Sequence, residues 1–109
     1  MAIFRVTVRG WFDELTDEQR SSLRAVAADH DVVTMGAFTE AGTLTYERGL
    51  HTFTLRVQLR SVADDPEATV LVEAERIARG ELEALGVAGR DLQATAVDMA
   101  SVWQRTGRR

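Results

Sequence analysis

The sequence of 109 residues has no cysteine and no lysine, a single proline, few aromatic side chains and no long apolar run. Without cysteine the fold has no disulfide and no thiolate chemistry, and nothing marks it as a secreted protein. The N-terminus leads directly into alternating apolar and polar residues, without the regions of a signal peptide. No apolar run approaches the length of a membrane span. We therefore expect a cytoplasmic protein without a membrane partner.

The charge of the chain is acidic overall, at −4, and all 13 of its basic residues are arginine. The planar guanidinium group pairs with carboxylate or phosphate through two parallel hydrogen bonds, which lysine cannot do. An acidic chain repels nucleic acid unless its positive charge is concentrated on one face. The distribution of the arginines therefore matters more than their number.

Two segments, 3–12 and 53–60, alternate between apolar and polar residues with the period of a β-strand. Strict alternation indicates that one face of each strand is buried and the other is not. The apolar positions expected on the buried face are Phe4, Val6, Val8, Phe53, Leu55, Val57 and Leu59.

Two helices are expected from their start signals. The spacing of Thr16 and Gln19 is that of a capping box and predicts a helix over 17–29. Asp64, Asp65 and Pro66 predict the start of a longer helix that ends near residue 86. Its expected apolar stripe is Leu71, Ala74, Ala78, Leu82 and Leu85.

Segment 31–47 again shows a period of two and is expected to form one long bent strand, with two short strands as the alternative. Residues 91–99 are expected to form the last strand, and 105–109 a frayed basic tail. This order predicts an α+β fold of the ferredoxin-like βαββαβ kind, as a single domain over 1–104. We expect both helices on one face of the antiparallel sheet, with the first and third strands in its centre.

Several segments resemble known proteins: FRVTVRGWF with LTDEQR, AFTEAGTLTYERGL with FTLRVQL, and DLQATAVDM. Together they are similar to a family of small actinobacterial proteins that is catalogued as a domain of unknown function. The resemblance covers nearly the whole chain, and it implies one domain of conserved length. The family carries no assigned activity.

No motif for catalysis, a metal or a cofactor emerges from the chain. His30 falls at the predicted C-terminal end of the first helix, where a positive charge suits the helix dipole. His51 lies in a turn before the third strand and is a weak candidate for a general acid or base. Two histidines without cysteine or an HExxH spacing argue against zinc, and the glycines form no phosphate loop.

The open face of the sheet is the expected functional surface. Its predicted ligand-binding residues are Arg5, Arg9, Trp11, Thr54 and Arg56. RNA-recognition domains with this element order stack bases on aromatic side chains at such positions, but only Trp11 is aromatic here, so we expect no nucleic acid. Several guanidinium groups on one small area repel unless anions compensate them. Acids of a partner subunit or a small carboxylate or phosphate ligand could do so.

The expected function is a homodimeric domain that binds a small anionic ligand or a protein partner. Domains of this kind often pair face to face or edge to edge into a dimeric α/β barrel, although that expectation rests on fold analogy. The alternatives are a cofactor-free enzyme built on such a barrel, of the oxygenase, isomerase or cyclase type, and a plain protein-interaction module.

Overall fold

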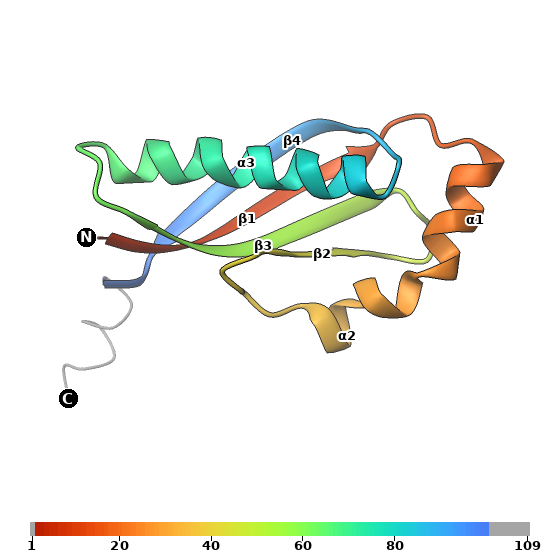
Figure 1. The fold of residues 1–109 in the computed structure, drawn as a ribbon, viewed down its shortest axis with the longest axis horizontal. Helices are drawn as coiled ribbons and strands as arrows, with labels where there is room; N and C mark the ends of the chain where they lie inside the picture. Colours follow the sequence, from red (N-terminus) through yellow and green to blue (C-terminus); the bar gives the residue numbers. More distant parts are fainter. Residues whose placement is uncertain (1, 101–109) are drawn as a thin grey trace.

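The computed structural model describes residues 2–100 and gives a mixed fold of one four-stranded sheet and three α-helices (Figure 1). In chain order the elements are β1 (Ala2–Phe12), α1 (Asp17–Ala25), a 3-10 turn η1 (Ala27–His30), α2 (Val32–Met35), β2 (Thr43–Tyr46), β3 (Thr52–Ser61), α3 (Pro66–Ala84) and β4 (Gly89–Asp98). The predicted tail 105–109 lies outside the described residues.

All neighbouring strands of the sheet are antiparallel, and their order is β2-β3-β1-β4. The first and third strands therefore lie in the centre, as the sequence predicts. In the register of these two strands, Val6 lies opposite Val57 and Val8 opposite Leu55. All seven apolar positions predicted for this face are buried except Leu59, which is half-buried.

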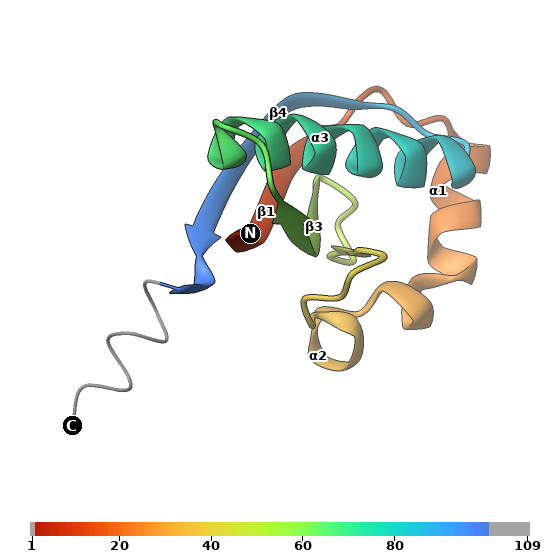
Figure 2. The ribbon, with the colours of Figure 1, turned by 60° about the vertical axis from the view of Figure 1, so that its left-hand side comes forward.

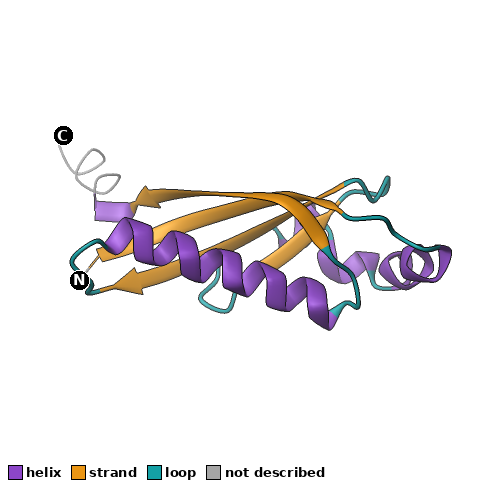
Figure 3. Cartoon of the chain, turned by 90° about the horizontal axis from the view of Figure 1, so that it is seen from above, coloured by secondary structure: helices purple, strands orange, loops and turns teal. Residues whose placement is uncertain are grey.

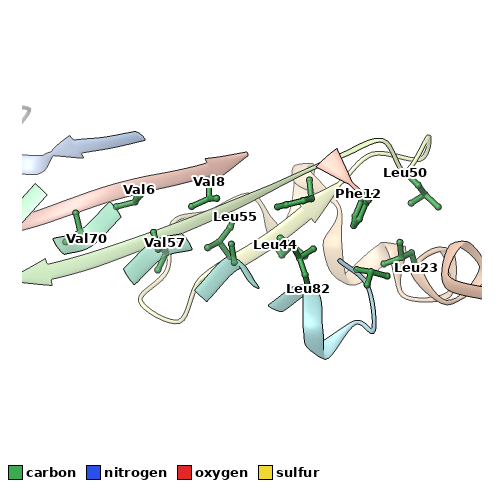
Figure 4. Packing of buried hydrophobic residues seen from close by; sticks show 14 of the residues in the cluster. Val6, Val8, Phe12, Leu23, Leu44, Leu50, Leu55, Val57, Val70 and Leu82 are labelled. Atoms are coloured by element: carbon green, nitrogen blue, oxygen red, sulfur yellow. The ribbon is translucent and has the colours of Figure 1, made fainter. Parts of the chain in front are cut away.

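Helix α3 runs along one face of the sheet and contacts β1, β3 and β4 (Figure 3). Its N-cap is Asp65, whose carboxylate accepts the backbone N–H of Ala68, and proline occupies the first turn as expected. The buried residues of this helix are Val70, Ala74, Ala78 and Leu82. Their side chains meet the apolar face of the central strands, and Figure 4 shows Leu82 and Val70 within this core.

Helix α1 corrects the prediction that both helices cover one face of the sheet. Thr16 forms the expected capping box with Gln19, but the helix ends at Ala25, four residues earlier than predicted. Leu23 is its one buried residue, so its apolar stripe is too narrow to cover a sheet. Figure 1 accordingly shows α1 beyond the end of the strands, while α3 alone lies across the face.

The segment 31–47 corrects the prediction of one long bent strand. Asp31 acts as an N-cap through the backbone N–H of Val33, which lets Val32–Met35 form the short helix α2 despite its β-branched residues. Thr39 then makes a single parallel bridge to Val57, and only Thr43–Tyr46 is a true strand. Figure 2 shows α2 well apart from α3, below the strands.

Candidate functional site

The candidate site is the sheet face that α3 leaves uncovered. Because side chains alternate along a strand, the polar residues of β1 and β3 point away from the core. The structure thereby places all five residues proposed as ligand-binding on this one face: Arg5, Arg9, Trp11, Thr54 and Arg56. Cross-strand pairing sets Arg9 opposite Thr54 on one side and Gln93 on the other.

Two of these arginines are already engaged by side chains of the same chain. The Nε atom of Arg5 donates to the amide oxygen of Gln58 at 3.3 Å, and its guanidinium carbon lies 5.6 Å from the ring centre of Phe38. Arg56 donates to the hydroxyl oxygen of Thr45 at 3.1 Å. Amide, hydroxyl and aromatic groups therefore hold these two guanidinium groups, rather than acids.

Arg9 differs from its two neighbours because it lines a hollow of about 360 Å³ in the sheet surface. Trp11, Thr52, Thr54, Asp91 and Gln93 contribute the other exposed or half-buried side chains of the hollow. No carboxylate among residues 2–100 lies within 4.0 Å of the Arg9 guanidinium. Hydroxyl, amide, indole, carboxylate and guanidinium groups thus line one open space.

A bulge in the sheet shapes this hollow. The pairing of β1 with β4 shifts between Arg9 and Trp11, and Asp91 beside the shift has a φ of 54° in the left-handed region. Arg90 binds the carboxylate of Asp91 at 3.3 Å and lies 6.0 Å from the ring centre of Trp11. The acid that lines the hollow is thus compensated by a cation other than Arg9.

Sequence reasoning missed Thr52, Asp91 and Gln93. Thr52 begins β3 but lies one residue before the predicted strand 53–60, and the predicted last strand, 91–99, carried no register that would set Gln93 opposite Arg9. The available signal was the alternation of Leu92 with Gln93, which assigns Gln93 to the uncovered face.

His51, the weak candidate for an acid or base, is exposed and does not line the Arg9 hollow. Its backbone N–H donates to the carboxylate of Glu47 at 2.6 Å, and its carbonyl oxygen accepts the N–H of Phe12 at 2.9 Å. These contacts give His51 a place in the turn between β2 and β3. They bring no substrate-binding group to its imidazole.

Over residues 2–100, no cluster of three or more histidine, aspartate or glutamate side chains is arranged to hold a metal ion. Within the same range, no helix has both the length and the apolar character needed to cross a membrane.

Comparison with models of protein families identifies a match for this chain. Over residues 1–109 the chain matches the model of a family described as "Family of unknown function (DUF6204)". No curated protein and no solved structure matches it.

Proposed function

The chain belongs to this family of unknown function, and from the geometry of the uncovered sheet face we propose that it is a binding domain for a small anionic ligand. The ligand is a carboxylate or phosphate of few atoms, and Arg9 is its principal partner.

The observation that carries this proposal is that Arg9 faces the hollow without an ion-pair partner among the described residues. Arg5 and Arg56 donate to acceptors within the chain, whereas no carboxylate of residues 2–100 lies within 4.0 Å of the Arg9 guanidinium, and Asp91, the acid that lines the hollow, is bound to Arg90. Hydrogen bonds between a guanidinium group and an anion are about twice as strong as neutral ones. Thr54 and Gln93, which flank Arg9 in the register, add hydroxyl and amide donors.

We also propose that the fold is a modified ferredoxin-like fold. Two central strands, β1 and β3, between two edge strands support it. The modification is that α1 stands at the end of the sheet instead of on its face, so only α3 fills the helical layer.

We propose that the domain is a homodimer in solution. What supports this is the exposure of large apolar side chains on the uncovered face: Trp11 is 47% exposed and Val97 52%. A second copy would bury both, and burial of apolar area favours association. Light scattering decides the point, because a dimer has twice the 12.1 kDa of the chain. A species of 12.1 kDa that does not change on concentration would rule it out.

The enzyme alternative needs an acid or base next to the bound anion. Among the described residues that line the Arg9 hollow, Asp91 is the only carboxylate, and it is bonded to Arg90. The geometry therefore favours binding over chemistry.

The test of the anion site compares Arg9→Gln with Arg60→Gln in thermal melts with phosphate and with citrate. Arg60 lies on β3 and points to the same uncovered face as Arg9, but it pairs with Glu40 at 3.9 Å. It is therefore the matched control. An anion at ten times its Kd stabilises a folded protein by about 1.4 kcal/mol. The wild type and the control should show this gain, whereas the Arg9 variant should not.

Two other outcomes would contradict the proposal. If the Arg9 variant gains as much stability from the anions as the wild type, the hollow is not the site. If Arg9→Gln instead dissociates a dimer and anions change no melting temperature, Arg9 serves an interface and not a ligand.

A further inference from the structure

A second hollow lies at the end of the molecule where α1, η1 and α2 approach the turn between β2 and β3. It measures about 560 Å³ and lies within the range typical of small-molecule sites. Its lining comes from four elements and the turn, and its charged groups are two acids, Asp31 and Glu47, and two arginines, Arg24 and Arg48.

The two acids of this hollow, Asp31 and Glu47, already accept hydrogen bonds from backbone N–H groups. Asp31 accepts the N–H of Val33 at 2.8 Å and thereby caps α2. The carboxylate of Glu47 accepts the N–H groups of Gly49, His51 and Thr52 at 2.8, 2.6 and 3.1 Å. Burial by itself would raise the pKa of Glu47. The three hydrogen bonds and the charge of His51 together have the larger effect, so the pKa lies below its ordinary value of 4.5.

The two arginines of the hollow, Arg24 and Arg48, have no ion-pair partner among the described residues. Arg24 comes from the last turn of α1, and Arg48 comes from the turn after β2. Within the described part of the chain, neither guanidinium has a carboxylate within 4.0 Å, since the ion pairs there involve Arg60, Arg76, Arg79 and Arg90. Two guanidinium groups from separate elements on one hollow can hold a carboxylate between them.

The rest of the wall is apolar and includes a fixed aromatic ring. Tyr46 stacks on His30 with ring centres 5.2 Å apart, packs edge-on against Phe12 and donates its hydroxyl hydrogen to the carbonyl oxygen of Leu23. The ring is therefore held in place from three sides. Ala27, Ala28, Val32 and Leu50 extend the apolar surface beside it.

We propose that this hollow binds a small organic carboxylic acid with an apolar body. Arg24 and Arg48 hold the carboxylate, and the apolar body lies against Tyr46, Val32 and Leu50. The site is independent of Arg9, whose hollow is lined by hydroxyl and amide groups and suits a compact polar anion.

The test uses 3-phenylpropionate as the probe and its neutral amide as the matched compound, titrated into the full chain by isothermal calorimetry. The carboxylate should bind at least about ten-fold more tightly than the amide, because the amide cannot form charge-assisted hydrogen bonds with both arginines. Equal affinity for the two compounds would overturn the proposal. So would the absence of saturable carboxylate binding below about 10 mM.

Variants locate the site. Arg24→Gln combined with Arg48→Gln should weaken phenylpropionate binding by about ten-fold or more. Arg20→Gln, on the same helix but outside the hollow, should leave the affinity unchanged. Both hollow arginines are exposed, so their loss spares the core. If the double variant still failed to fold, Ala28→Trp, which fills the hollow and keeps both charges, should also abolish binding. A tight-binding Ala28→Trp or double variant would show that the hollow is not the site.

Discussion

The Nδ1 atom of His30 lies 2.7 Å from the carbonyl oxygen of Leu44. Because a carbonyl oxygen can only accept, the ring nitrogen is the donor and carries the proton. Leu44 belongs to β2, which is an edge strand whose outer backbone groups face no other strand. His30 thus donates to a carbonyl oxygen of the edge strand and connects η1 to the sheet. The interaction with the helix dipole that the sequence suggested for His30 does not include this contact.

The first prediction concerns this contact. His30→Phe keeps an aromatic ring on Tyr46 but leaves the carbonyl of Leu44 without its donor, so the free energy of unfolding should fall by about 1 kcal/mol. Urea denaturation measures the change. His51→Phe is the matched control, because the imidazole of His51 is exposed, and it should change stability by less than about 0.5 kcal/mol. Equal losses in the two variants would show that the His30 contact contributes nothing of its own.

The second prediction is a pH dependence that comes from Glu47. Its pKa is lower in the folded protein than its ordinary value of 4.5, since the three backbone hydrogen bonds and His51 outweigh the effect of burial. A lowered folded-state pKa contributes stability that is fully present above the unfolded pKa and is lost as the pH falls through the folded one. Glu47→Gln should therefore be less stable than the wild type at pH 7, and this difference should shrink below about pH 4.5.

Melting temperatures between pH 3 and pH 7 check this expectation. Glu83→Gln removes an exposed carboxylate of α3 and serves as the control for the change in net charge. A Glu47 variant whose deficit stayed constant over the whole range would assign the loss to the shape of the side chain and not to its charge.

The parts of the fold that sequence reasoning predicted are those where one pattern persists over ten or more residues. In β1, β3 and α3 a single period runs the length of the element, and tertiary packing only has to agree with it. Val32 and Val33 illustrate the opposite case. Their β-branched side chains favour a strand, but the N–H of Val33 donates a capping hydrogen bond to the carboxylate of Asp31, and the segment forms a four-residue helix.

The candidate site shows the same division. Alternation along β1 is enough to assign Arg9 and Trp11 to the uncovered face. The hollow itself depends on the bulge and on the left-handed backbone of Asp91, which lies on a strand remote in sequence. Long-range register of this kind is set by the whole sheet, so no local pattern in the chain could have predicted it.

The last prediction contrasts two glycines. Gly80 lies inside α3, which is continuous through it, and a Cβ added there would meet no atom within 4 Å. Gly42 precedes β2 with a φ of +92°, and a Cβ there would lie 3.2 Å from Ile77 Cγ2 and 3.3 Å from Leu55 Cδ1. Alanine stabilises a helix interior by about 1 kcal/mol relative to glycine, so Gly80→Ala should raise the melting temperature by several degrees. Gly42→Ala must adopt a left-handed backbone and press on two core side chains, so it should lower stability by more than about 1 kcal/mol.

Differential scanning calorimetry of both variants measures the sign of each change in stability. A gain at Gly42 would mean that the loop before β2 is not held in this conformation, whereas a loss at Gly80 would mean that the helix surface there is covered, as it would be by a partner of the domain.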